Sequence, residues 1–289
     1  MLFKEWEVLL VDDEPDVLAI SKLAMNNIEI YGLPLKIRTA ASKAEAIEII
    51  RQAPEMVPKL AVAFIDVVME TDHAGLELCQ YIREELGNDV TQLYIRTGQP
   101  GVTTEREVMD RYDINGYFTK IEMTEDKLYS LAKSGVRQFL WSWSAFALNN
   151  ALNGYIANSE SREQLMQFSR QLVEGVFSES SGGETSDVDS YHNMYAGWME
   201  GKLEVATGWN EEQAVEVRDR LSQMEGVALG PDGDHYIQDG NNFLIKIAPT
   251  ENKAENIGLY NLSYQMPRNM ITMLYILENC FSTLWKRAS

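Results

Sequence analysis

The chain has 289 residues, of which 45% are hydrophobic and 24% charged, and its formal net charge at pH 7 is −19. This composition is ordinary for a folded globular protein, and the length favours two domains. Residues 1–150 carry 15 basic against 24 acidic residues, and residues 151–289 carry 10 against 20. Neither half offers the basic surface that DNA binding requires, so we expect no nucleic-acid partner.

No run of 18 or more apolar residues occurs, and the N-terminal stretch has acidic residues where a signal peptide needs its cleavage site. We therefore expect a cytoplasmic protein without a membrane segment. The two cysteines, Cys79 and Cys280, both lie in apolar helical patterns. We interpret both as buried thiols, which fits a reducing compartment.

Short apolar runs alternate with amphipathic stretches through the first 119 residues. The predicted strands cover residues 7–11, 35–39, 60–65, 92–96 and 116–119. The predicted helices cover residues 15–27, a stretch that Ser42 caps with Glu45 at the capping-box position, 75–86 and 104–111. Residues 60–65 (LAVAFI) are apolar throughout, as in a strand buried on both faces of a parallel sheet. This alternation predicts a five-stranded, doubly wound parallel α/β domain.

A long helix is predicted over residues 124–152, with Thr124 as its cap. Its apolar residues recur mostly three or four positions apart, at Leu128, Leu131, Val136, Phe139, Trp143, Phe146 and Ala147. Trp141 lies off this stripe. The stripe is consistent either with packing on a following domain or with a helix that forms a homodimer.

The remaining sequence predicts an α+β domain. A helix is expected at 159–177 and a Gly/Ser-rich loop at 178–190. A strand at 203–207, a helix at 211–224, strands at 226–229, 235–237, 243–248 and 258–264, and a helix at 268–286 follow. We place the domain limits at 1–123 for the α/β domain, 124–152 for the linking helix and 153–289 for the α+β domain.

Three carboxylates follow the predicted strands: Asp12 and Asp13 come after the first, and Asp66 ends the third. The carboxyl ends of strands in an open parallel sheet line the ligand crevice, so these side chains should converge. Because closely spaced carboxylates repel each other, we expect a hard divalent cation, and Mg²⁺ fits the oxygen ligands. Asp66 could then act as a nucleophile on a phosphoryl donor.

Two further strand ends carry groups suited to a phosphoryl group. Lys120 ends the last strand and supplies a cation, while Thr97 ends the fourth strand and supplies a hydroxyl. Tyr117 precedes Lys120 by three residues and could move with Thr97 as a two-state switch. Each residue alone is common on surfaces and in turns. Their ordered occurrence at four predicted strand ends favours a phosphoryl-transfer site.

The segments LLVDDEPD, FIDVVM, IRTG and GYFTK resemble, in order and spacing, the flavodoxin-like receiver domain of two-component response regulators. The resemblance covers about residues 5–123. It implies a metal-binding pair at Asp12 and Asp13, a phosphoacceptor at Asp66, a metal-binding backbone carbonyl at Val68, a switch pair at Thr97 and Tyr117, and a phosphate-contacting lysine at Lys120. Ile121 stands where receivers usually have a proline, which leaves the local loop geometry open.

A narrower resemblance concerns a receiver subgroup in which a GAF-like domain of unknown function follows. The stretches DVVMETDHAGLELCQYIREELGN and IRTGQPG carry it, and KLEVATG and MLYILENCFSTLW are similar to the second domain. The resemblance implies a response regulator that takes a phosphoryl group on Asp66 from a histidine kinase or phosphotransfer protein. We expect it to use Mg²⁺, to have no enzymatic activity, and to relay its state by protein–protein or domain–domain contact, as a homodimer.

Two alternatives stay open. The chain could be the regulatory fragment of a longer protein whose C-terminal enzymatic output, for example a cyclic-di-GMP phosphodiesterase, is absent from it. Alternatively, residues 153–289 could hold an unrecognised enzyme, although no acid, base or metal set is visible there.

Overall fold

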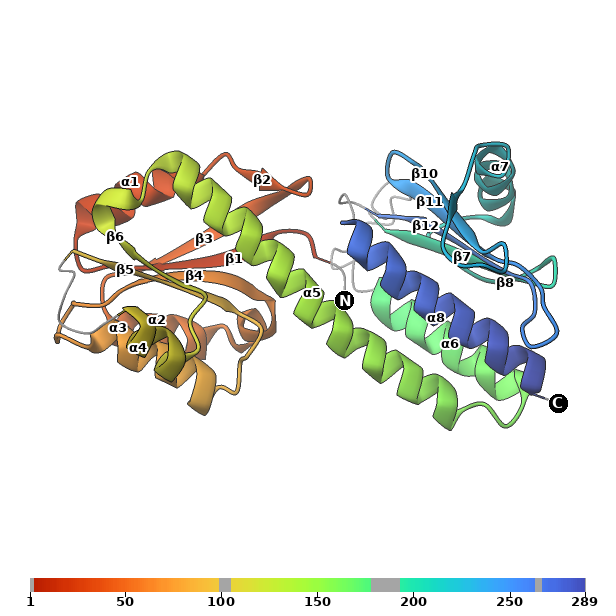
Figure 1. Cartoon of the computed structure of the whole chain (residues 1–289), viewed down its shortest axis with the longest axis horizontal. Coiled ribbons are helices and arrows are strands. Elements are labelled where there is room, and N and C mark those ends of the chain that lie inside the picture. Colours follow the sequence, from red (N-terminus) through yellow and green to blue (C-terminus); the bar gives the residue numbers. More distant parts are fainter. Residues whose placement is uncertain (1–2, 99–104, 178–192, 263–266, 289) are drawn as a thin grey trace. The chain divides into compact units, whose positions relative to one another are not determined.

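The computed structural model describes residues 3–98, 105–177, 193–262 and 267–288 (Figure 1). The chain divides into an N-terminal unit, Phe3–Trp143, and a C-terminal unit, Ser144–Ser289. The division falls within one long helix, α5 (Glu125–Ala157).

The N-terminal unit is built on a sheet with the strand order β2-β3-β1-β4-β5-β6. Its strands are β1 (Trp6–Val11), β2 (Glu29–Ile30), β3 (Leu33–Ala40), β4 (Leu60–Asp66), β5 (Gln92–Thr97) and β6 (Gly116–Thr119). All five predicted strands are present and mutually parallel, while the short β2 pairs antiparallel with β3. Without β2, the order is that of the flavodoxin-like doubly wound fold, which confirms the predicted fold class.

Helices cover both faces of this sheet, which explains why its central strands are apolar throughout. Helix α1 (Pro15–Met25) and the first half of α5 lie on one face (Figure 1). On the other face lie α2 (Lys43–Gln52), α3 (Ala74–Gln80) and α4 (Glu105–Tyr112). Three short helical turns, η1 (Pro54–Lys59), η2 (Tyr81–Glu85) and η3 (Lys120–Glu122), complete the connections. Every residue of β1, β4 and β5 is buried, as expected for strands covered on both faces.

Two predicted helix caps are present. The Oγ atom of Ser42 accepts a hydrogen bond from the backbone N–H of Glu45 at 3.1 Å, and Thr124 Oγ1 accepts one from Lys127 at 3.3 Å. The carboxylate of Glu45 accepts from the N–H of Ala41 rather than from that of the cap residue. Thr104, which we predicted as the first residue of the fourth helix, lies outside the described residues.

The predicted apolar stripe of α5 is wrong at Phe146. Leu128, Val136 and Phe139 are at most 2% exposed, whereas Phe146 is 66% exposed. Ser144 is buried as well. Residues two apart on an α-helix lie on nearly opposite faces, so Phe146 lies on the face opposite to that of Ser144, away from the covered side.

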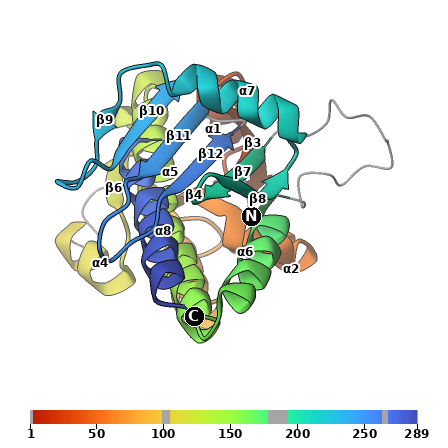
Figure 2. The same cartoon turned by 90° about the vertical axis from the view of Figure 1, so that its right-hand side faces the viewer.

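The C-terminal unit is an antiparallel sheet with the order β8-β7-β12-β11-β10-β9. Its strands are β7 (Met194–Met199), β8 (Lys202–Thr207), β9 (Val227–Ala228), β10 (His235–Asp239), β11 (Asn242–Ile247) and β12 (Asn256–Asn261). Helices α6 (Arg162–Phe177) and α8 (Arg268–Arg287) cover one face, and α7 (Glu211–Leu221) lies on the other (Figures 1 and 2). The predicted loop at 178–190 lies outside the described residues.

Strand β7 was missing from the prediction. Its sequence, MYAGWM, has no polar alternation because residues on both of its sides are buried. Trp198 packs in the cluster that includes Ala214 of α7, while the ring of Tyr195 lies against that of Tyr260. The Tyr and Trp residues of this segment therefore pack in the core.

A buried carboxylate lies between α8 and the sheet. Glu278, which is 4% exposed, accepts hydrogen bonds from the hydroxyls of Tyr195 (3.2 Å) and Tyr260, and from Asn256 Nδ2 (2.6 Å). Burial raises the pKa of Glu278, and the hydrogen bonds from Tyr260, Asn256 and Tyr195 oppose that rise. A Cβ atom at Gly258 would come within 2.2 Å of Glu278 Oε1, so a larger residue at this strand position would displace the buried carboxylate.

The two cysteines differ from one another. Cys79 is fully buried, and burial raises its pKa to about 12, as expected for an inert core thiol. Cys280 is only partly buried, which corrects the prediction for that residue. Position on an apolar helix stripe indicates which face is covered but not how completely.

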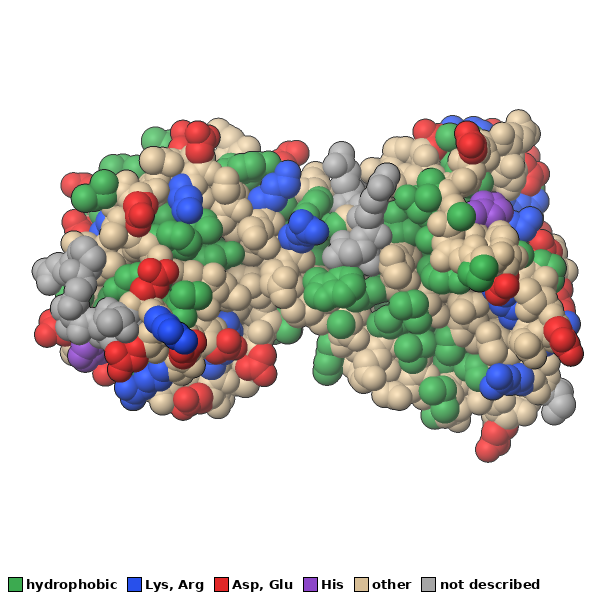
Figure 3. Space-filling view, viewed as in Figure 1, with side chains coloured by type: hydrophobic (Ala, Val, Ile, Leu, Met, Phe, Trp, Pro, Cys, Tyr) green, Lys and Arg blue, Asp and Glu red, His purple; other side chains and the backbone are tan. Residues whose placement is uncertain are grey.

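Charged side chains of both signs are distributed over the surface. On the face drawn in Figure 3, Lys and Arg residues are scattered among Asp and Glu residues and do not gather into a large patch. Among the helices of the described ranges, none combines the length and the apolar character needed to cross a membrane.

Candidate functional site

The structure brings the three predicted carboxylates together. Each of Asp12, Asp13 and Asp66 offers an oxygen that lies within 4.8 Å of the others. They meet because β1 and β4 are parallel neighbours in which Val11 is paired with Ile65. Asp12 and Asp66 are buried, whereas Asp13 is exposed. We call these three residues the acidic cluster.

Lys120 is a cation that contacts the acidic cluster. Its Nζ atom lies 2.8 Å from Asp66 Oδ2, 3.1 Å from Asp12 Oδ1 and 2.6 Å from Glu14 Oε1. Burial lowers the pKa of Lys120, but hydrogen bonds to Asp66, Glu14 and Asp12 outweigh it and hold the pKa above its ordinary value. The lysine therefore carries its charge at neutral pH.

Asp66 ends β4 with one oxygen engaged and one without a partner. Its Oδ2 atom pairs with Lys120, whereas its buried Oδ1 atom has no hydrogen-bond partner among the described residues. Burial raises the pKa of Asp66, and the hydrogen bond and charge of Lys120 oppose that rise. A buried, unpartnered carboxylate oxygen beside Asp13 suits a hard divalent cation, so the cluster fits Mg²⁺.

The backbone after Asp66 is fixed by close packing of α3. The N–H of Gly75 donates to the carbonyl of Val67 at 3.0 Å, and the N–H of Val67 donates to the carbonyl of Arg96 at 3.1 Å. A Cβ atom on Gly75 would come within 1.8 Å of the Asp66 carbonyl oxygen, so only glycine allows this approach. Val68 lies in this loop, and its backbone role in metal binding stays a prediction.

The predicted switch residues lie on neighbouring strands. Thr97 ends β5 and is 1% exposed, and β6 places Tyr117 opposite Ile95. Tyr117 is partly buried and packs against the apolar core that contains Val108 and Ile114. The structure thus shows one conformation of these residues, and their switching stays a prediction.

Arg96 belongs to the surroundings of the acidic cluster and was not predicted. It is 1% exposed in β5, its Nη2 atom lies 3.3 Å from Asp12 Oδ2, and its Nη1 atom donates to Ser21 Oγ at 2.9 Å. Burial lowers the pKa of Arg96, and the charges of Asp12 and Asp66 oppose this change. The available signal was a single arginine at the end of the predicted strand 92–96.

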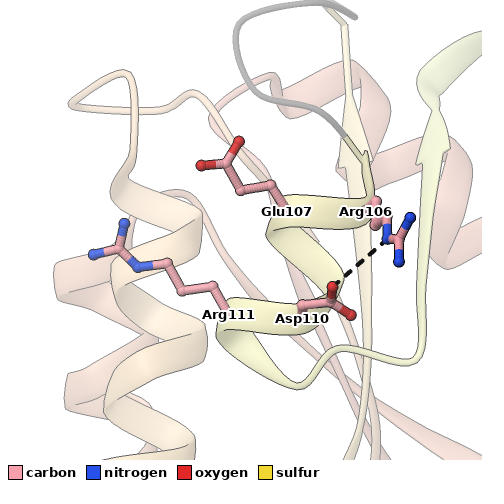
Figure 4. Close-up of a pocket in the computed structure, with 4 residues that line it drawn as sticks. All are labelled: Arg106, Glu107, Asp110 and Arg111. Carbon is pink, nitrogen blue, oxygen red and sulfur yellow. Dashed lines mark ion pairs between the residues drawn. The ribbon is translucent and has the colours of Figure 1, made fainter.

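A separate open depression lies against α4 (Figure 4). It is lined by Arg106, Glu107, Asp110 and Arg111, all from this one helix. Arg106 Nε and Asp110 Oδ2 form an ion pair at 3.9 Å, and both side chains are largely exposed. Exposed pairs of this kind contribute little energy.

The comparisons with known proteins concern part of the chain. No protein-family model matches it. Among curated proteins, 3'3'-cGAMP-specific phosphodiesterase 2 of Vibrio cholerae is 40% identical over 134 residues, which are 46% of this chain and 25% of that protein. The match therefore spans about a quarter of this relative's length.

Several solved structures are similar to about half of the chain. An adenylate cyclase from Rhodopirellula baltica is 20% identical, covers 50% of this chain and 98% of its own, and has a TM-score of 0.41. The signal receiver domain of an HD domain-containing protein from Pseudomonas fluorescens is 14% identical, with coverages of 49% and 94% and a TM-score of 0.41. The chemotaxis protein CheY4 of Vibrio cholerae is 18% identical, with coverages of 44% and 96% and a TM-score of 0.37.

Most of these similar structures are receiver domains of response regulators. Their sequence identities to this chain are low, and the strand order of the N-terminal unit defines its fold independently of them. The predicted GAF-like character of the C-terminal unit stays a prediction.

Proposed function

We propose that the chain is a two-component response regulator. In this proposal Asp66 accepts a phosphoryl group from a histidine kinase or phosphotransfer protein, and the metal site comprises Asp12, Asp13, Asp66 and the backbone carbonyl of Val68. The output is contact with a protein or with the C-terminal unit, not DNA binding.

The observation that carries the proposal is the environment of Asp66. Its carboxylate is 2% exposed, lies beside two further carboxylates, and keeps one oxygen without a hydrogen-bond partner in the described part of the chain. Such an arrangement costs stability, because buried charged and polar groups need partners. It provides what a phosphoryl acceptor requires, which is a fixed nucleophilic oxygen with a cation beside it.

The proposed transfer is a single displacement. An oxygen of Asp66 attacks the phosphorus of a phosphohistidine, a P–O bond forms as the P–N bond breaks, and the imidazole leaves with the electron pair and takes up a proton. Lys120 is placed to neutralise charge on the phosphoryl oxygens. Mg²⁺, when bound to the acidic cluster, supplies further electrostatic stabilisation of those oxygens.

The proposed relay begins at Thr97, whose hydroxyl follows the phosphoryl group, and continues through Tyr117 to the surface formed by α4, β6 and α5. Helix α5 is also the element that continues into the C-terminal unit.

We propose that the chain is a homodimer. Light scattering of the purified protein tests this, and a monomer at high concentration would contradict it.

The phosphorylation proposal is tested with acetyl phosphate. The protein incubated with acetyl phosphate and MgCl₂ should gain the mass of one phosphoryl group, because Asp66 is a poised acceptor. Asp66→Asn should remove the gain, since an amide cannot attack the phosphorus. The matched control is Asp72→Asn, an exposed position in the loop after β4 that should be labelled like the wild type. The proposal fails if Asp66→Asn is labelled, or if no donor labels the wild type.

Without metal, Asp66 should show a defined pH dependence. Burial raises its pKa more than Lys120 lowers it. In the metal-free protein the Asp66 carboxylate should therefore titrate, in carbon NMR spectra, at a higher pH than an ordinary aspartate. Titration at or below the ordinary range of aspartate would contradict this environment of Asp66.

The identity to the Vibrio phosphodiesterase favours a narrower second candidate, in which the phosphorylated chain regulates cyclic-dinucleotide hydrolysis. The group of potential metal ligands found in the described residues consists of three aspartates without histidine. We therefore expect the purified chain alone not to hydrolyse 3'3'-cGAMP. Hydrolysis by the chain alone would instead place an enzyme within these 289 residues.

A further inference from the structure

Besides Lys120, a second cation lies beside the acidic cluster, which is the buried Arg96. Its guanidinium spans from Asp12 Oδ2 to Ser21 of α1, and Ser21 is itself 5% exposed. The Nε atom of Arg96 has no hydrogen-bond partner in the described part of the chain. A buried guanidinium with an unsatisfied donor lowers the stability of the fold, so packing alone does not explain Arg96. The positive charge of the side chain is the property that can offset this loss.

The two aspartates after β1 differ in their hydrogen bonds and ion pairs. Both oxygens of Asp12 are engaged, Oδ2 by Arg96 and Oδ1 by Lys120 (3.1 Å) and by the N–H of Glu14 (3.0 Å). Asp13 is exposed and makes no ion pair with any residue of the described ranges. Among the described residues, the oxygens without a protein partner therefore belong to Asp13 and Asp66, whereas Asp12 enters the proposed metal site with its charge already offset by Arg96 and Lys120.

The acidic cluster and its charged neighbours carry a net negative charge. Four carboxylates meet two cations, and the six groups are Asp12, Asp13, Glu14, Asp66, Arg96 and Lys120. The neighbourhood therefore carries a net charge of about −2 with Arg96, and about −3 without it. Because Arg96 and Asp12 are buried, their charges are screened little by salt.

We propose that Arg96 is a positioning residue that holds Asp12 as a neutralised carboxylate and that its charge sets the Mg²⁺ affinity of the acidic cluster. The inference rests on the proposed metal site and deepens it. Removing the charge should tighten Mg²⁺ binding about tenfold, because one repelling cation is lost at short range. Arg96 thus stabilises the fold around the acidic cluster when no metal is bound, and it weakens the binding of Mg²⁺.

The test is isothermal titration of the full chain with MgCl₂ and no phosphoryl donor. Two variants remove the charge, Arg96→Gln, which keeps a donor, and Arg96→Met, which keeps the length. Two controls keep it, Arg96→Lys and Ser21→Ala. The neutral variants should bind Mg²⁺ about tenfold tighter than the wild type, and the charged controls within about twofold of it.

A purely structural role predicts the opposite pattern, in which all four variants bind Mg²⁺ more weakly as the site loosens. Unchanged or weaker binding by both neutral variants would overturn the proposal. If neither neutral variant is folded without metal, MgCl₂ should restore the folded circular dichroism spectrum, and failure to do so would also overturn it. Absence of Mg²⁺ binding by the wild type would defeat the proposed metal site itself, which is a distinguishable result.

Discussion

Glu278→Ala is expected to lower the free energy of unfolding of the C-terminal unit by about 3–5 kcal/mol. The substitution creates a cavity and leaves three buried donors without an acceptor, namely the hydroxyls of Tyr195 and Tyr260 and the amide of Asn256. The loss should be visible as faster hydrogen exchange of the backbone amides of β7 and β12, which share this network.

A comparison with Glu278→Gln separates the network from the charge. Glutamine keeps an oxygen that accepts from the two tyrosines, and it is neutral. Because burial already raises the pKa of Glu278, Glu278→Gln should lower the free energy of unfolding clearly less than Glu278→Ala does. Glu163→Ala on the exposed side of α6 is the matched control and should change little. Equal stability of Glu278→Ala and the wild type would show that the network is not stabilising.

Lys120→Ala is expected to destabilise the N-terminal unit by about 3 kcal/mol in the absence of Mg²⁺. Asp66 would lose its ion pair and would have neither oxygen engaged by a side chain, while the repulsion from Asp12 remains. Mg²⁺ should recover most of this loss, because a divalent cation replaces the missing charge. Hydrogen exchange of β1 and β4 with and without MgCl₂ measures both effects.

The matched control for this substitution is Lys133→Ala, which removes an exposed lysine of α5. It should cost little and should show the same Mg²⁺ response as the wild type. A Lys120→Ala variant that is destabilised but does not respond to Mg²⁺ would contradict a metal site at the acidic cluster.

The sequence predicted the N-terminal unit well because its signals are local. Apolar runs such as residues 60–65 define buried parallel strands, and acidic residues at their ends mark the edge where ligands bind. Caps such as Ser42 define helix starts from two or three residues. The positions of Asp12 and Asp66 therefore followed from strand order alone, and the structure places their carboxylates together.

The features that the sequence did not reveal depend on contacts between distant residues. Arg96 lies 84 residues from Asp12 in the sequence, and no local pattern near either residue indicates that they form a pair. Strand β7 has no alternation because both of its faces are covered, and Phe146 is exposed because it lies on nearly the opposite face of α5 from the buried Ser144. Glu278 lies in an apolar helical pattern, and the sequence does not indicate the three side chains that donate hydrogen bonds to it.

The most direct measurement identifies the labelled residue. After incubation with acetyl phosphate and MgCl₂, borohydride reduction converts an aspartyl phosphate into homoserine, which tandem mass spectrometry locates in the sequence. The account predicts homoserine at position 66 and nowhere else, because Asp66 combines burial, an unpartnered oxygen and contact with Lys120. Homoserine at Asp12 or Asp13, or none at any position under labelling conditions, would contradict it.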